Sequence, residues 1–92
     1  MQHLRGSAIK IISQPDPVTL TTVVIEKIVD PDGTSVITNE ATTLETVNSN
    51  VRAFYVWQSL VTNVVGRYTY VAKATNGIYS DRTKGFFYLE EV

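Results

Sequence analysis

The chain has 92 residues and a mass of 10.2 kDa, which is the size of one small domain. Eight Lys and Arg residues stand against nine Asp and Glu residues, and this net charge of −1 argues against binding nucleic acid or an anionic membrane by charge alone. The absence of Cys excludes disulfides, thiolate nucleophiles and Cys-ligated zinc. The 13 Val, 7 Ile and 12 Thr residues favour strands over helices, because β-branched side chains fit an extended backbone.

Turn-forming residues divide the chain at regular intervals into short segments. These breaks lie at Gln14–Pro17, Asp30–Gly33, Asn48–Asn50, Thr62–Gly66 and Asn76–Gly77. Strands at this spacing are typical of a β-sandwich or barrel. No linker or repeat interrupts the pattern, so residues 1–92 are predicted to form a single domain, with residues 1–7 as a loose N-terminal arm. No apolar run approaches the roughly 20 residues of a membrane-spanning helix, so we expect no membrane insertion.

The first two predicted strands differ in how their apolar residues are spaced. Ala8–Ser13 alternates regularly and places Ile9 and Ile11 on one face. Val18–Val29 carries apolar residues on both faces, which indicates either burial on both sides or a bulge that shifts the inward face by one residue. We favour the bulge, because the charged side chains that begin at Glu26 need solvent.

The middle of the chain is predicted to contain a hairpin followed by two further strands. Asp30–Gly33 has the residue types of a tight turn, and it would pair the preceding strand with Thr34–Thr38. Thr42–Val47 alternates as a half-exposed strand, and Val51–Leu60 forms the next strand.

The last third of the chain shows the clearest alternation. Arg67–Thr75 has small and aromatic residues at every second position, and Lys84–Glu90 is the final strand. Between them, Asn76–Gly77 is a strong signal for a two-residue hairpin turn, although Asn76–Arg82 could instead form a longer loop. The prediction is therefore an all-β, antiparallel sandwich of two sheets and about seven strands.

The segment Val65–Gly77 resembles the penultimate strand of immunoglobulin-like and fibronectin type III-like sandwiches, which show a Gly-x-Tyr-x-(Cys or aliphatic/aromatic)-x-Ala-x-Asn-Gly rhythm. The resemblance implies that Tyr68 is a tyrosine-corner residue, whose hydroxyl bonds an upstream backbone group. It also implies that Tyr70 stands where immunoglobulin domains have their second Cys, so that the module would be free of disulfides. Val23–Gly33 looks like the second strand and turn of macroglobulin-type and phage-borne immunoglobulin-like modules. Trp57 is assigned a structural role alongside the two tyrosines.

No group of residues indicates catalysis or metal binding. His3 is the sole His and lies in the arm, without neighbours that would hold it as a base or ligand. Asp30 and Asp32 could offer oxygens to Ca²⁺, but that ion takes about six to eight ligands, so we interpret them as turn residues. The other acids are scattered, and the glycines form no phosphate-binding cluster. We therefore expect neither an enzyme nor a cofactor.

Basic residues interleaved with aromatic residues raise the alternative of a platform for single-stranded nucleic acid. The residues concerned are Arg52, Arg67, Lys73, Arg82 and Lys84 with Tyr55, Tyr79 and Tyr88. We interpret the basic residues instead as the solvent faces of alternating strands, because the net charge is −1, and we expect no nucleic-acid partner.

The candidate contact surface is the predicted tip that holds Ile78, Tyr79, Asp81 and Arg82. Loops at the ends of sandwiches often carry recognition, and Tyr and Arg are frequent contact anchors. Alternatively, Ile78 and Tyr79 continue a strand out of a tight hairpin. An unguarded edge strand is a second candidate, because it can pair with another chain.

The expected function is that of a non-catalytic interaction module with protein partners, either copies of itself or other components of a larger assembly. The initial Met and the lack of a visible secretion signal favour a virion or phage structural protein. The alternative is an adhesion or spacer module of a bacterial or archaeal surface protein, with carbohydrate stacking on Trp57 or Tyr79 as a variant of that role. A small hydrolase is a third hypothesis, which would require a cleft.

Overall fold

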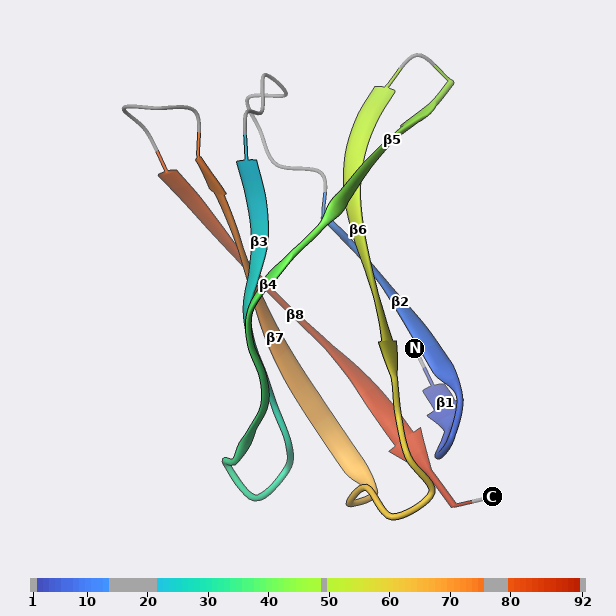
Figure 1. The fold of residues 1–92 in the computed structure, drawn as a ribbon. Helices are drawn as coiled ribbons and strands as arrows, with labels where there is room; N and C mark the ends of the chain where they lie inside the picture. The colour runs from blue at the N-terminus through green and yellow to red at the C-terminus, as the bar shows by residue number, and fades with distance from the viewer. Residues whose placement is uncertain (1, 14–21, 49, 76–79, 92) are drawn as a thin grey trace.

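Strands account for the regular structure of this protein. The computed structural model describes residues 2–13, 22–48, 50–75 and 80–91, and every regular element in these ranges is a strand (Figure 1). In chain order the strands are β1 (Gln2–Leu4), β2 (Ala8–Ser13), β3 (Thr22–Val29), β4 (Ser35–Ala41), β5 (Thr43–Val47), β6 (Asn50–Gln58), β7 (Gly66–Thr75) and β8 (Ser80–Glu90). The all-β class is therefore confirmed, but the predicted count of seven strands is wrong, because β1 is an eighth.

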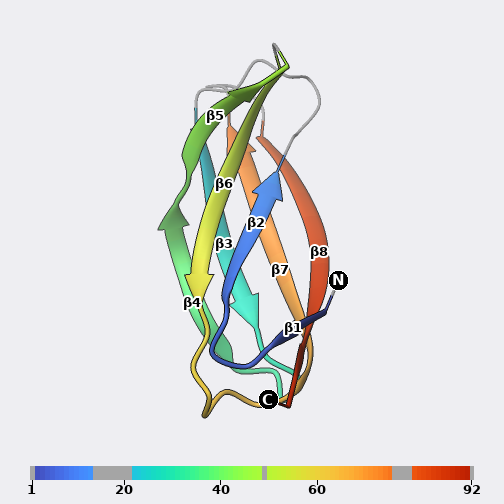
Figure 2. The same ribbon diagram turned by 90° about the vertical axis from the view of Figure 1, so that its right-hand side faces the viewer.

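The strands form two sheets that face each other. One sheet has five strands in the order β1-β8-β7-β3-β4, and the other has three in the order β2-β6-β5 (Figure 2). Neighbouring strands are antiparallel except for β1, which runs parallel to β8 with Gln2 opposite Tyr88. The expectation of purely antiparallel pairing is thus wrong at this edge.

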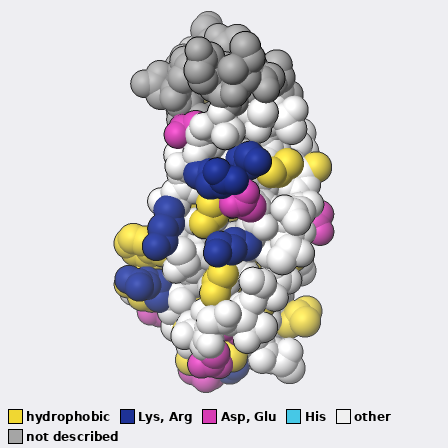
Figure 3. All heavy atoms as spheres, turned by 90° about the vertical axis from the view of Figure 1, so that its left-hand side faces the viewer, with side chains coloured by type: hydrophobic (Ala, Val, Ile, Leu, Met, Phe, Trp, Pro, Cys, Tyr) yellow, Lys and Arg dark blue, Asp and Glu magenta, His cyan; other side chains and the backbone are white. Residues whose placement is uncertain are grey.

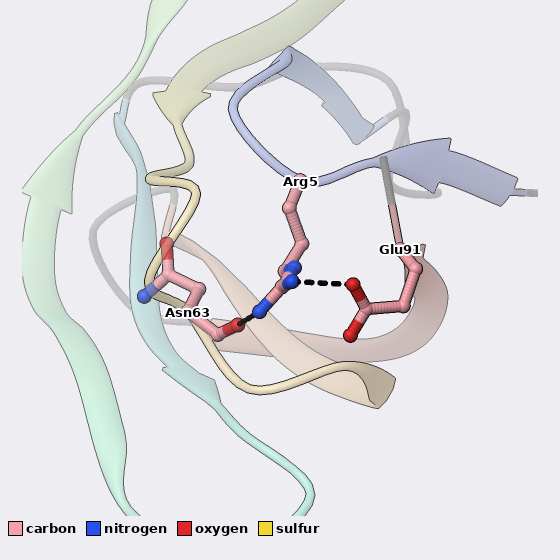
Figure 4. A network of polar contacts seen from close by, with 3 residues as sticks. All are labelled: Arg5, Asn63 and Glu91. Atoms are coloured by element: carbon pink, nitrogen blue, oxygen red, sulfur yellow. Dashed lines mark hydrogen bonds and ion pairs between the residues drawn. The ribbon is translucent and has the colours of Figure 1, made fainter.

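Residues 2–7 are tied to the sandwich and are not the loose arm that the sequence suggested. Beyond β1, the Arg5 backbone N–H donates to the Glu90 carbonyl oxygen at 3.0 Å. The Arg5 guanidinium donates to the Asn63 carbonyl oxygen at 3.2 Å and forms an ion pair with the Glu91 carboxylate at 2.6 Å (Figure 4). The Gly6 N–H donates to Ser59 Oγ at 3.1 Å. These contacts depend on groups far away in the sequence, which local apolar patterning does not reveal.

The chain passes from one sheet to the other on both sides of the sandwich. On one side, residues 5–7 connect β1 of the larger sheet to β2 of the smaller sheet. On the other side only Thr42 separates β4 from β5, and its hydroxyl donates to the Val23 carbonyl oxygen at 2.6 Å. Because both crossings are short, they fix the position of one sheet relative to the other.

The core lies between the sheets and is centred on three aromatic rings. Tyr68 stacks on Phe87 with ring centroids 5.4 Å apart, and Trp57 lies 5.4 Å from Tyr68 and 5.9 Å from Phe87. Aliphatic residues surround these rings, namely Ile9, Ile11, Ile25, Ile28, Ala72 and Leu89. The predicted inward placement of Ile9 and Ile11 is confirmed, since both are buried. Aromatic pairs contribute about 0.5–1.5 kcal/mol beyond the area they bury.

The bulge expected in the second predicted strand is present in β3. Its register against β7 shifts between Ile25, which lies opposite Ala72, and Lys27, which lies opposite Val71. The extra residue at Glu26 restores the inward face for Ile28, which is completely buried. The charged side chains of Glu26 and Lys27 stay on the outer face as a result.

Gly85 is required by the packing of Tyr70, the residue opposite it across β7 and β8. A Cβ atom at position 85 would overlap the ring and hydroxyl of Tyr70, so the half-buried tyrosine covers the backbone of the glycine. An aromatic side chain laid over a strand glycine supplies packing that glycine lacks. This contact explains why the apolar alternation of β8 is interrupted at position 85.

We predict that Gly85→Ala lowers the free energy of unfolding by about 1–3 kcal/mol, because the new methyl group must displace the Tyr70 ring. Chemical denaturation measures the loss. The double variant Gly85→Ala/Tyr70→Leu should lose less than the sum of its single variants, because the smaller side chain removes the overlap. Additive losses would show that the ring does not restrict this position.

Candidate functional site

Of the four residues predicted to form the contact tip, the structure describes Asp81 and Arg82. Asp81 and Arg82 are residues of β8, where they lie opposite Ala74 and Lys73 of β7. Their assignment to a loop is therefore wrong, because the ladder between β7 and β8 continues as far as the Thr75–Ser80 pair. Ile78 and Tyr79, together with the Asn76–Gly77 turn, lie outside the described residues.

Tyr68 makes the hydrogen bond that the resemblance implied for it. Its ring is completely buried, and its hydroxyl donates to the Val64 carbonyl oxygen, four residues upstream, at 2.7 Å. Burial raises the pKa of this phenol, and the carboxylates of Asp30 and Asp32 raise that pKa further. The interaction joins β7 to the loop that precedes it.

We predict that Tyr68→Phe lowers the free energy of unfolding by about 1–2 kcal/mol, since the Val64 carbonyl oxygen loses its donor. For a domain of this size, that corresponds to a melting temperature lower by about 5–10 °C. A raised pKa favours the neutral phenol in the folded state, so this stabilising contribution is complete below the unfolded pKa of about 10 and is lost as the pH rises through the folded pKa. The difference in the free energy of unfolding between wild type and Tyr68→Phe should therefore become smaller at alkaline pH. A difference that stays constant between pH 7 and pH 11 would contradict this explanation.

Trp57 belongs to the core and cannot be an exposed platform for a sugar. Only 7% of its surface is accessible, and its indole packs against both Tyr68 and Phe87. The Trp57 version of the carbohydrate hypothesis is therefore wrong. Tyr70, in contrast, is half-buried and packs against the edge of the core.

The outer face of the five-stranded sheet gathers basic side chains from three strands. We call this set the basic face, and it consists of Lys27 of β3, Arg67 and Lys73 of β7, and Arg82 and Lys84 of β8. The space-filling view of this side shows Lys and Arg concentrated over the middle of the sheet (Figure 3). Glu26 lies among them and pairs with the Arg82 guanidinium at 3.2 Å. The face therefore carries more positive than negative charge in a chain whose net charge is −1.

Two of these bases lie directly opposite each other across the strands. Arg82 faces Lys73, and Lys84 faces Val71, with Lys27 on the far side of Val71. Like charges in directly opposed positions destabilise a sheet. Among the described residues of this face, one carboxylate accompanies five bases and offsets the repulsion only in part. The arrangement favours an anionic group as the missing counter-charge.

Exposed aromatic residues continue the basic face toward the C-terminal end of β8. Phe86 is 55% exposed and Tyr88 is 37% exposed, and their rings meet edge to face at 5.9 Å. The Arg67 guanidinium lies 5.8 Å from the centre of the Phe86 ring. Sequence reasoning overlooked Phe86 as a surface residue, and it placed Lys27 in solvent without including it among the candidate bases. Arg82, Lys84, Phe86 and Tyr88 occupy every second position of the strand, and this spacing was the signal that could have placed them on one face.

On the three-stranded sheet, the basic side chains of Lys10 and Arg52 both pair with the Glu45 carboxylate. Glu45 accepts a hydrogen bond from Arg52 Nε at 2.7 Å and forms an ion pair with Lys10 at 3.3 Å. The Lys10 ammonium also lies 4.6 Å from the centre of the Phe54 ring. The hydrogen bond from Arg52 is the largest influence that holds the pKa of Glu45 below its ordinary value. Arg52 thus lies on the opposite sheet from the other bases of the proposed nucleic-acid platform.

We predict that Arg52→Gln raises the pKa of Glu45 toward its ordinary value, because the variant removes the main stabiliser of the carboxylate. Carbon-detected NMR titration of the side chain measures this shift. A lowered pKa means that the contribution of Glu45 to folding is present above its unfolded pKa and is lost as the pH falls through the folded value. An unchanged Glu45 pKa in the variant would contradict the assignment.

The remaining candidates for chemistry are not brought together. The Asp30 carboxylate accepts hydrogen bonds from the backbone N–H groups of Asp32 and Thr34, both at 2.9 Å, as expected of a turn residue. The His3 ring lies edge-on to Phe87 with centroids 6.3 Å apart. Among the described residues there is no group of three or more His, Asp or Glu side chains placed to hold a metal ion.

Comparisons of this chain with protein-family models, with curated proteins and with solved structures gave no significant match. Within the described ranges, no helix has the length and apolar character to cross a membrane.

Proposed function

We propose that this chain is an immunoglobulin-like module that acts by non-catalytic surface contact with protein in a larger assembly. The strand order supports the immunoglobulin-like part of the proposal. The orders β2-β6-β5 and β8-β7-β3-β4 correspond to the B-E-D and G-F-C-C′ orders of variable-type immunoglobulin sandwiches. The hydrogen bond between Tyr68 and Val64 matches the tyrosine corner of that family.

The observation that carries the contact function is the basic face with its exposed aromatic extension. Arg and aromatic residues are enriched in protein interfaces, and a few such residues supply most of the binding energy. Here they project from hydrogen-bonded strands, so little backbone conformational entropy remains to be lost on binding. Neither Phe86 nor Tyr88 is buried in the core, and the opposed pair of bases lowers stability when no partner is present.

The proposed setting is a virion or phage particle, with the protein as a structural component. The alternative is an adhesion or spacer module on a bacterial or archaeal surface, and the same face would serve both settings. The stacking version of the alternative now rests on Tyr79, because Trp57 is buried. Quantification of the protein in purified particles and in cell-envelope fractions separates the two settings.

Site-specific photo-crosslinking tests the contact function. We predict that p-benzoylphenylalanine in place of Tyr88, expressed in the source organism, gives a discrete protein adduct, because this side chain lies on the exposed face. The matched control is the same replacement at Thr43, an exposed residue of β5 in the other sheet. Mass spectrometry identifies the adduct. No adduct, or equal adducts from both positions, would overturn the proposal.

A further inference from the structure

Among the described residues, two strand edges on the same side of the sandwich remain open along most of their length. Strand β1 pairs with β8 only over Tyr88–Glu90, so Ser80–Phe87 has a strand neighbour on one side only among the described residues. Strand β2 likewise pairs only with β6 in the described part of the chain. Figure 2 shows β2 in the nearer sheet and β8 in the farther sheet, both toward the same side of the sandwich.

A groove of about 150 Å³ lies between these two edges. Its walls are Ile9–Ile12 of β2 and Phe86–Phe87 of β8, and Tyr70 completes the lining. Lys10 is the only charged residue that the described part of the chain contributes to this lining, and its ammonium is already engaged by Glu45 and Phe54. The groove therefore presents apolar side chains between two rows of backbone donors and acceptors.

The chain itself shows that the free side of β8 accepts an extended segment. Strand β1 occupies the last three positions of this side, where Gln2, His3 and Leu4 lie opposite Tyr88, Leu89 and Glu90. The open stretch from Ser80 to Phe87 continues directly from it. At about 3.3 Å per residue, this stretch gives room for a strand of roughly eight residues.

We propose that this groove binds an extended segment of a partner protein as an added strand along β8, with apolar side chains directed into the groove and acidic side chains facing Arg82 and Lys84. This inference rests on the proposed contact function and names the partner's chemistry. Successive residues of a strand point to opposite faces, so acids two residues apart match the spacing of Arg82 and Lys84. The segment would thus alternate apolar and acidic residues.

The same charges argue against a second copy of this chain as the occupant. Pairing of β8 with β8 of another copy would bring Arg and Lys side chains close together, and charged residues on an edge are a common protection against self-pairing. Lys84 has no ion-pair partner among the described residues, so it is free to meet an acid. An acidic partner strand is compatible with this edge, whereas a basic copy is not.

The backbone edge also favours a polypeptide over a nucleic acid. An open strand offers alternating N–H donors and carbonyl acceptors, which another strand satisfies completely. A phosphate backbone offers acceptors only, so it would leave the carbonyl groups of β8 unpaired. The apolar lining of the groove likewise fits aliphatic side chains.

The test measures binding of the whole 92-residue protein to the peptide acetyl-SVEVEVEVS-amide by calorimetry, with amide hydrogen exchange as the structural readout. We predict saturable binding and slower exchange in β8 between Ser80 and Phe87. A peptide with Lys in place of each Glu should bind at least tenfold more weakly. So should a peptide of the original sequence with alternate backbone nitrogens methylated, because it keeps its charges but cannot complete a ladder.

Two glutamate substitutions locate the site on the protein. Lys84→Glu should weaken binding of the acidic peptide at least tenfold and favour the Lys peptide, whereas Thr43→Glu should change affinity less than threefold. Both residues are exposed, but Thr43 lies on β5 of the other sheet, away from the open edge of β8. Unchanged melting temperatures of the variants confirm that both remain folded.

Several outcomes would overturn strand addition. These are equal binding of the methylated peptide, equal loss of affinity in the Thr43 and Lys84 variants, displacement of the peptide by single-stranded oligothymidylate, and no binding at 1 mM peptide. If the photo-crosslinker at position 88 gives a protein adduct but one of these four outcomes is observed, the contact function is retained and only strand addition is refuted. If the photo-crosslinker gives no adduct but the acidic peptide binds, the proposed contact function is refuted.

Discussion

The packing of Tyr68 is the interaction on which the rest of the structure depends. Its ring lies between the two sheets against Trp57 and Phe87, and its hydroxyl is bound to the Val64 carbonyl oxygen. A domain of 92 residues has a small core, so a few large side chains must contribute most of its buried area. One residue thereby joins both sheets and the loop that leads into β7.

The same hairpin that supplies the core also builds the proposed contact surface. Along β8, Phe87 and Leu89 point inward while Arg82, Lys84, Phe86 and Tyr88 point outward, because successive side chains alternate between faces. The core therefore fixes the outer residues in position without using them. Binding groups held on a packed strand keep a defined spacing, which is what a partner strand with its own fixed repeat requires.

The successes and failures of the sequence predictions have a common physical origin. The bulge at Glu26 and the turn at Asp30 were predictable because both depend on neighbouring residues. The strand β1 and the extension of β8 through Asp81 were missed, because their sequences lack apolar alternation and their hydrogen bonds are made to distant segments. The exposure of Phe86 was missed because the run of three aromatic residues hid the alternation that begins at Arg82 and Lys84.

Alternation, turn chemistry and the Gly-x-Tyr pattern, all of which are local, determined from the sequence alone that this chain is an all-β protein with Tyr68 in its core. Only the tertiary structure decided which outer faces converge and which edges stay open. Five bases dispersed between positions 27 and 84 become one surface because β3, β7 and β8 are neighbours in a single sheet. Strand order depends on contacts between segments far apart in the chain. The two-residue alternation of apolar and polar side chains carries no information about which strands become neighbours.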